Sequence, residues 1–197
     1  MAELTPFQPV GPYFHVMLDG LGRVAVLAGA DARGERITVE GVLRDGAGAP
    51  MPDGMIEIWQ ADCEGRYAHP EDPRGASADP QFWGYGRMDT DDAGRFRFDT
   101  IKPGPVPAPD GTLSAGTPER RSLMQAPHIL VSVYAPGILK RWVTRMYFED
   151  EAANSADPVL QLVPADRRHT LIAKRDGSTY RFDIALQGQD ETVFFDV

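Results

Sequence analysis

The residues of this chain that could carry metal chemistry are its four histidines and its tyrosines. The histidines are His15, His69, His128 and His169. Tyr67 stands two residues before His69, so a short predicted strand would place an oxygen and a nitrogen on one face, to which His128 adds a second nitrogen. Phenolates and imidazoles suit trivalent iron, because anionic oxygens offset its charge and the metal keeps the phenols deprotonated. The alternative reading is that these are hydrogen-bonded core side chains.

The element that would position His128 is a predicted strand over residues 125–134. The chain enters it through Pro127, and β-branched residues follow at alternate positions. In an extended chain His128, Leu130, Ser132 and Tyr134 share one face. A ligand two residues after His128 could bind the same metal, but Leu130 has no donor atom.

The sequence gives little support for phosphate binding, serine hydrolysis or cysteine catalysis. Gly20-Leu21-Gly22 does not follow a strand, and no lysine-serine pair closes a phosphate-binding loop. Serine-centred hydrolase motifs are absent. Cys63 could pair with a histidine, but its neighbours Asp62 and Glu64 disfavour the thiolate. His169 follows two arginines, so we expect it on the surface.

Length and charge narrow the class of protein. A chain of 197 residues suits one domain with a large core. The net charge of -9, with acidic residues spread along the chain, argues against nucleic-acid binding. Cys63 is the only cysteine, and residues 1–14 have neither a basic nor an apolar leader region. We therefore expect a soluble, cytoplasmic protein.

The fold class follows from period-two patterns between turn residues. The 20 glycines and 17 prolines indicate many turns. Strands are predicted at residues 37–40, 55–60, 95–99, 128–134, 141–148, 171–174 and 179–186, with a short strand or docked tail at 193–195. Helix is limited to single turns at 149–153 and 164–169. This pattern predicts an all-β protein, a β-sandwich of mostly antiparallel strands with little helix.

Residues 1–36 are predicted to form an extended arm, and residues 37–197 the β-sandwich domain. Three prolines between residues 5 and 13 exclude a helix or a central strand. The aromatic residues Phe7, Tyr13 and Phe14 are unusual for a disordered tail. An arm of this kind lies on a surface, either its own or that of a partner chain.

Several segments resemble the intradiol ring-cleaving dioxygenase family. The matching segments lie in the family's order over most of residues 40–150, which is more specific than one motif. They are Glu57-Ile58-Trp59-Gln60-Ala61-Asp62, Gly65-Arg66-Tyr67, Gly86-Arg87, residues 90–96, Thr100-Ile101-Lys102-Pro103-Gly104-Pro105, Pro127-His128-Ile129 and Arg145-Met146-Tyr147-Phe148. The arm and the C-terminal segment resemble one branch of this family, which is assembled from homologous α and β chains, and specifically its α chain.

In iron-binding members, the resemblance implies two tyrosine and two histidine ligands. Tyr67 matches the first tyrosine, whereas Val106 stands where the second follows Lys-Pro-Gly-Pro. His128 matches the first histidine of His-x-His, and Leu130 replaces the second. Gln125 stands where the family has an arginine that binds and polarises the ring substrate. The resemblance therefore implies an α chain that binds no iron and has no catalytic residue of its own.

The resemblance also implies the partner and the reaction. A homologous β chain would carry Fe³⁺, and Gly11, Pro12 and Tyr13 of this chain would line its substrate pocket. The assembly would insert O₂ into 3,4-dihydroxybenzoate to give 3-carboxy-cis,cis-muconate, in the β-ketoadipate route of aromatic breakdown. Pro136 interrupts a turn where family α chains can carry an arginine, so no carboxylate contact is predicted there.

Two other functions remain open from the sequence. The chain could be a self-sufficient dioxygenase with an atypical iron site made of Tyr67, His69, Tyr85 and His128. It could instead be a β-sandwich scaffold module without a link to catalysis. Visible absorption and activity of the chain, expressed alone and with a candidate β chain, distinguish these functions.

Overall fold

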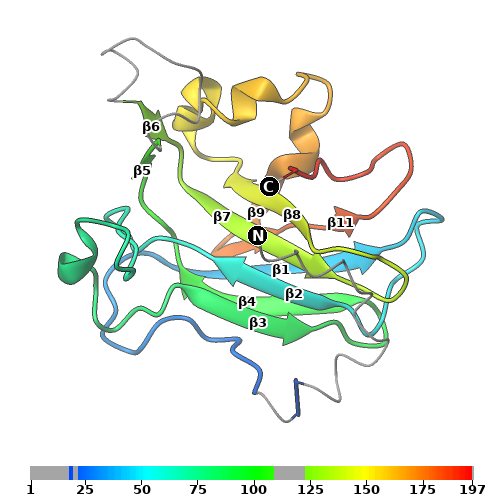
Figure 1. The fold of residues 1–197 in the computed structure, drawn as a ribbon, viewed down its shortest axis with the longest axis horizontal. Coiled ribbons are helices and arrows are strands. Elements are labelled where there is room, and N and C mark those ends of the chain that lie inside the picture. Colours follow the sequence, from blue (N-terminus) through cyan, green and yellow to red (C-terminus); the bar gives the residue numbers. More distant parts are fainter. Residues whose placement is uncertain (1–17, 20–21, 109–122, 197) are drawn as a thin grey trace, which may run out of the picture.

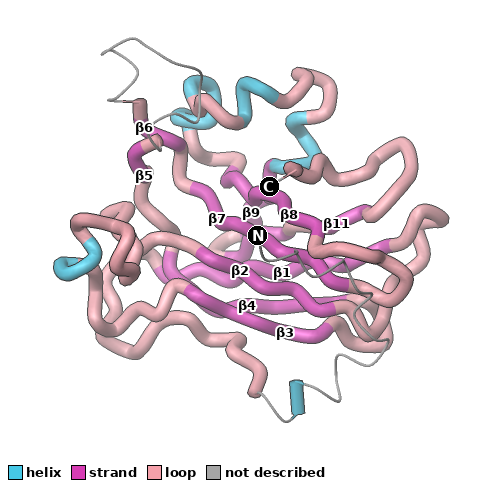
Figure 2. Tube along the Cα trace, in the orientation of Figure 1, coloured by secondary structure: helices cyan, strands magenta, loops and turns pink. Residues whose placement is uncertain are grey.

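The computed structural model of the chain describes residues 18–19, 22–108 and 123–196. Within them, most strands form one nine-stranded sheet, two short strands form a separate sheet, and short 3-10 turns lie beside the large sheet (Figures 1 and 2). The strands are β1 (Arg36–Arg44), β2 (Met55–Trp59), β3 (Tyr85–Asp89), β4 (Arg95–Ile101), β5 (Val106–Pro107), β6 (Met124–Gln125), β7 (His128–Tyr134), β8 (Trp142–Phe148), β9 (Ile172–Asp176), β10 (Thr179–Arg181) and β11 (Ile184–Ala185). The all-β prediction is confirmed.

The sheet runs in the order β11-β1-β10-β9-β8-β7-β2-β3, and β4 pairs with β1. Most neighbours are antiparallel, as predicted, but β1 is parallel to β10 and β11, and β8 is parallel to β9. The β8–β9 contact joins the two layers expected of a sandwich into one continuous sheet. The result is nearly a closed barrel around one core.

The core is built from the inward faces of these strands. Ile129, Val131 and Val133 of β7 are at most 2% exposed and pack against Ile56 and Phe98 among others. The alternate side chains of β7 point the other way, as the sequence pattern predicts. Burying one such aliphatic side chain stabilises the fold by roughly 1.5–3 kcal/mol.

Two predicted elements differ from the structure. The expected strand over residues 179–186 is divided into β10 and β11, because Asp183 between them accepts a hydrogen bond from the Val42 amide (3.0 Å). Both halves still pair with β1. β3 was not predicted, since Gly86 and polar residues break its apolar alternation.

The predicted helical turns are 3-10 turns, η3 (Ala152–Ala156) and η5 (Arg168–Leu171), with η4 (Leu160–Leu162) between them and η1 (Gly75–Ser77) elsewhere. The segment that holds η3, η4 and η5 lies at the end of β7 and β8 nearest β6 (Figure 1). There Leu160, Val163 and Leu171 bury the ring of Tyr147. No helix in the described part of the chain is long and apolar enough to cross a membrane.

The second half of the predicted arm packs on the domain itself. Bridges join Val24 to Arg87 of β3 and Val26 to Asp99 of β4. Leu27, the residue after Val26, is fully buried in the core. The N-terminal half of the arm, including Gly11, Pro12, Tyr13 and His15, lies outside the described residues.

Candidate functional site

The candidate site lies at one end of β2, β7 and β8, where the positions of the family's iron ligands gather. Tyr67 lies in the loop that follows β2, and Val106 begins β5. His128 and Leu130 both lie on the outward face of β7.

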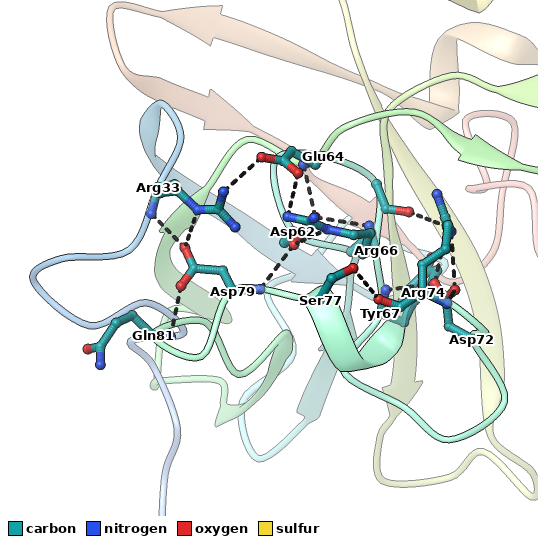
Figure 3. A network of polar contacts seen from close by, with 12 residues as sticks. Arg33, Asp62, Glu64, Arg66, Tyr67, Asp72, Arg74, Ser77, Asp79 and Gln81 are labelled. Atoms are coloured by element: carbon teal, nitrogen blue, oxygen red, sulfur yellow. Dashed lines mark hydrogen bonds and ion pairs between the residues drawn. The ribbon is translucent and has the colours of Figure 1, made fainter.

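Two carboxylates fix the loop that carries Tyr67 (Figure 3). Asp62, 1% exposed, accepts hydrogen bonds from the amides of Glu64 and Arg66, both at 2.9 Å. Asp72 accepts a hydrogen bond from the Tyr67 amide at 3.0 Å. Tyr67 is therefore held in an irregular loop and not in a strand, which corrects the predicted strand at Tyr67–His69.

Two glycines bring the Tyr67 loop against the segment that leads to Val106. Gly65 has φ +73°, and a Cβ atom there would lie 1.9 Å from the Pro105 carbonyl oxygen. A Cβ atom on Gly104 would lie 2.5 Å from the Cys63 carbonyl oxygen. Only glycine permits this approach of backbone to backbone. As a result Tyr67 and Val106 line the same cavity, of about 640 Å³.

The ring of His128 is buried and neutral. Its Nδ1 atom lies 2.7 Å from the Ala126 carbonyl oxygen, and because a carbonyl only accepts, Nδ1 is the nitrogen that carries the proton. Burial and the nearby Arg145 guanidinium lower the pKa of His128 to about 4. The other outward residues of β7, including Leu130, are half-buried.

A guanidinium lies among these positions, which was not foreseen from the sequence. Arg145 of β8 pairs with Leu130 across the sheet, and its Nη1 donates a hydrogen bond to Gln125 Oε1 at 2.6 Å. Gln125 in turn pairs with Val106 between β6 and β5. Burial raises the pKa of Tyr67, which keeps its phenol protonated, and Arg145 only partly opposes this.

These residues do not fit a ferric iron site. Val106 and Leu130 have no atom that can coordinate a metal, and only Tyr67 and His128 of the four matching positions have one. The charge of Arg145 affects the pKa of both remaining residues, so a cation is already present near them. Within the described residues, no group of three or more His, Cys, Asp or Glu side chains could hold a metal ion.

The atypical ligand set does not form a site either. The Trp59 indole stacks on Tyr67, with ring centroids 5.9 Å apart, and contacts His69 and Tyr85 at 6.3 and 6.4 Å. These three residues thus surround an indole. The Tyr85 hydroxyl donates to Glu57 Oε1 at 2.7 Å, and burial together with Glu57 raises the pKa of Tyr85 to about 12.

The other candidates from the sequence have ordinary roles. His169 is exposed, as predicted, and its Nδ1 lies 2.8 Å from the Asp166 carbonyl oxygen. The pKa of Cys63 is raised, as expected, although burial contributes more than Asp62 does. Pro136 lies in a turn with its neighbour Gly137.

The comparisons with known proteins identify the family of the chain. A family model described as Dioxygenase matches residues 11–188. The chain is 42% identical over 209 residues to the protocatechuate 3,4-dioxygenase alpha chain of Burkholderia cepacia, covering 98% of this chain and 97% of that one. The chain therefore belongs to this dioxygenase family, the intradiol family whose motifs its sequence contains.

Both kinds of chain of that enzyme are relatives. The beta chain of the Burkholderia cepacia protocatechuate 3,4-dioxygenase is 38% identical over 167 residues, covering 81% of this chain and 67% of that one. Among solved structures, the dioxygenase domain of a Streptomyces fusion protein has a TM-score of 0.58 at 25% identity, covering 94% of this chain and 99% of that one. The alpha-chain relative therefore matches almost end to end, whereas the beta chain matches in part.

Three residues at the site were missed from the sequence: Trp59, Glu57 and Arg145. All three lie inside segments that match the family, so the sequence motifs already contained them. Their roles depend on which strands are neighbours. Leu130 lies between Trp59 and Arg145 across the sheet, and this register cannot be read from one strand alone.

Proposed function

We propose that this chain is the iron-free α chain of a protocatechuate 3,4-dioxygenase. The assembly would pair it with a homologous β chain that binds Fe³⁺. It would cleave 3,4-dihydroxybenzoate with O₂ to 3-carboxy-cis,cis-muconate, in the β-ketoadipate pathway. The alpha-chain relative, matched almost end to end, supports this proposal.

We assign the iron to the partner because of the residue types at the four ligand positions of this chain. Val106 and Leu130 are apolar, and the charge of Arg145 acts on the remaining Tyr67 and His128. A guanidinium repels a metal cation. The chain's part in the reaction is therefore to shape the partner's pocket and to hold the assembly together.

The arm is proposed to make the contact with the partner's substrate pocket, through Gly11, Pro12 and Tyr13. Glycine lets backbone come close to a ligand, and proline presents a rigid apolar wall without a donor. We also propose that the assembly is cytoplasmic. The single cysteine, Cys63, supports this location, because the chain forms no internal disulfide.

The test is expression of this chain alone and together with a β chain whose Lys-Pro-Gly-Pro-Tyr and His-x-His motifs are intact. The pair is expected to copurify, to contain iron, to show the broad visible band of ferric tyrosinate and to cleave 3,4-dihydroxybenzoate. The lone chain is expected to be colourless and inactive. Iron and colour in the lone chain would instead establish a self-sufficient enzyme, and failure to copurify would favour the scaffold reading.

A substitution in the arm tests its proposed place. Pro12→Arg is expected to raise KM for 3,4-dihydroxybenzoate about threefold to tenfold, the effect of losing about 1 kcal/mol of binding. Copurification and iron content should not change. Steady-state kinetics of the assembly measures this, with Pro73→Arg on the exposed loop as the control. Unchanged kinetics in Pro12→Arg would show that the arm lies elsewhere.

A further inference from the structure

The arm meets the domain at residues 18–19 and 22–24, where both apolar and polar contacts hold it. Leu18 is 1% exposed and packs against Met55 of β2 and Tyr134 of β7. The Gly22 amide donates a hydrogen bond to the Leu18 carbonyl oxygen at 2.8 Å, so the backbone at these two residues lies close together. Gly22 has φ +80°, a left-handed conformation that glycine adopts without strain.

The Arg23 side chain joins the arm to the sheet. Its Nε and Nη2 atoms donate to the two carboxylate oxygens of Asp89, the last residue of β3, with Nη2 at 2.8 Å. Its Nη1 atom donates to Asp19 at 2.7 Å. Because a guanidinium is a rigid planar fork, two bonds to one carboxylate fix its orientation. Arg23 thus ties the arm residue Asp19 to the end of a strand.

The chain that follows Arg23 is fixed by backbone contacts on both sides. Val24 exchanges hydrogen bonds with Arg87 of β3, at 2.8 and 3.0 Å. The residues directly after Val24 bond in the same way to Asp99 of β4, at 2.8 and 2.9 Å. Arg23 therefore stands where a segment held within the sheet gives way to the arm.

This ion pair is too exposed to contribute much to the stability of the fold. The side chain of Arg23 is 39% exposed, that of Asp19 66% and that of Asp89 14%. Ion pairs near the surface add little stability, because water and salt screen the charges. What the rigid fork does provide is a fixed geometry between the arm and β3.

We propose that Arg23 is a positioning residue for the reaction, because its bonds to Asp89 and Asp19 fix the direction in which the arm leaves the domain. The proposal rests on the proposed function, in which residues 11–13 line the partner's substrate pocket. Arg23 itself contacts neither substrate nor iron. It acts through the arm, and so determines how well the pocket wall fits the substrate.

The short distance along the chain makes the place of Leu18 and Asp19 matter. Tyr13 precedes Leu18 by five residues, which span at most roughly 18 Å. A shift of the arm where it joins the domain is therefore transmitted to residues 11–13 over a short connection. Displacement of a positioning group by about 1 Å can already impair an enzyme. The effect falls on substrate binding, since the arm supplies no reacting group.

Steady-state kinetics of the α/β assembly tests the proposal. Arg23→Gln and Asp89→Asn should each raise KM for 3,4-dihydroxybenzoate about twofold to fivefold and leave kcat within about twofold, the range expected for loss of one surface ion pair. Arg181→Gln removes an equal charge from the exposed pair of Arg181 and Asp183 and should change neither constant. Unchanged KM in both Arg23→Gln and Asp89→Asn, or a fall in kcat without a change in KM, overturns the proposal.

Iron content, copurification and the midpoint of urea denaturation separate positioning from a general loss of structure. All three should stay close to the wild-type values in Arg23→Gln, because the guanidinium lies at the surface. A raised KM that is accompanied by loss of iron or of the partner chain would show a structural role and contradict the proposal.

A double variant shows whether Arg23 acts through the arm. Pro12→Arg combined with Arg23→Gln should raise KM by less than the product of the two single effects, because both changes disturb the same contact. Pro12→Arg combined with Arg181→Gln should behave as Pro12→Arg alone. Single effects of Pro12→Arg and Arg23→Gln that multiply would show that Arg23 acts by another route, and the proposal would fail.

This inference and the proposed function fail in different ways. If Pro12→Arg has no effect on KM, the arm lies elsewhere, which overturns its place in the proposed function and this inference with it. If Pro12→Arg raises KM as expected and Arg23→Gln has wild-type kinetics, the proposed function stands and only the role of Arg23 is overturned.

Discussion

The two faces of β7 carry residues of opposite character on one strand. Inward, Ile129, Val131 and Val133 are at most 2% exposed and belong to the main core. Outward, Leu130 and Ser132 are half-buried and border a cavity. The inward side chains stabilise the fold by packing in the core. Leu130 and Ser132, on the outward face, contribute less to that packing and line the cavity instead.

This difference explains how a site can lose its metal ligands without loss of the fold. A substitution outward, such as a leucine at position 130, changes the chemistry of the cavity and leaves the packing between the sheet layers intact. The loops at the site are equally preserved, since Gly65 and Gly104 still meet the opposite backbone. The residues that line the cavity can therefore change without a change in the residues that hold the fold.

The largest effect that would test this comparison is truncation on the inward face. Ile129→Ala should lower the free energy of unfolding by about 2–5 kcal/mol, because it leaves a cavity in a closely packed core. Leu130→Ala should cost only about 1 kcal/mol, because part of its side chain already faces water. Urea denaturation of both variants measures this, and equal losses would show that the two faces do not differ.

His128 is the one buried side chain on the outward face of β7, and its burial should make the stability of the fold depend on pH. The pKa of His128 is lowered to about 4, below the ordinary value of 6.5, so between these pH values the unfolded chain binds the proton more readily. Stability is retained above pH 6.5 and declines as the pH falls toward 4, by about 3 kcal/mol in all. Below pH 4 both states are protonated and this loss stops.

Denaturation curves across that pH range measure the effect. His128→Gln, which has no titrating ring, should show a smaller decline than the wild-type chain. Exposed His169 is the matched control, and His169→Gln should follow the wild type. Identical curves for wild type and His128→Gln would mean that the ring is not buried in its neutral form.

The smallest effect concerns the hydrogen bonds of Glu57. Glu57→Gln should lower the pKa of Tyr85 from about 12 by about one unit, because the negative acceptor is removed while burial remains. Absorbance titration after a rapid pH jump detects this, with Tyr85→Phe to assign the signal. Glu71→Gln, on an exposed loop, should change nothing. An unaltered Tyr85 pKa would show that burial alone sets it.

Much of this molecule could be predicted from the sequence where the pattern is local. The alternation in residues 128–134 predicted both the strand and the residues of each face. The tight turns followed from Asp-Gly and Gly signals. Likewise, the family motifs predict that Val106 and Leu130 stand at ligand positions, because the residues around them match those motifs.

The remainder depends on contacts between distant segments. Arg145 acquires its role from the register with Leu130 and from its hydrogen bond to Gln125, twenty residues away. Tyr67 was expected in a strand, but Asp72, five residues later, holds its amide in a loop instead. No period in the sequence encodes either contact.

The pairing of β1 with the last strands has a consequence for how the chain folds during synthesis. The hydrogen bond from Val42 to Asp183 spans 141 residues. On one edge, β1 can pair early with β4, but its other edge stays open until β10 and β11 have been made. Contacts so distant in sequence are associated with slow folding and with exposed strand edges in the nascent chain. The emerging chain therefore carries an unpaired edge, where chaperones or other chains can bind, until β10 and β11 have left the ribosome.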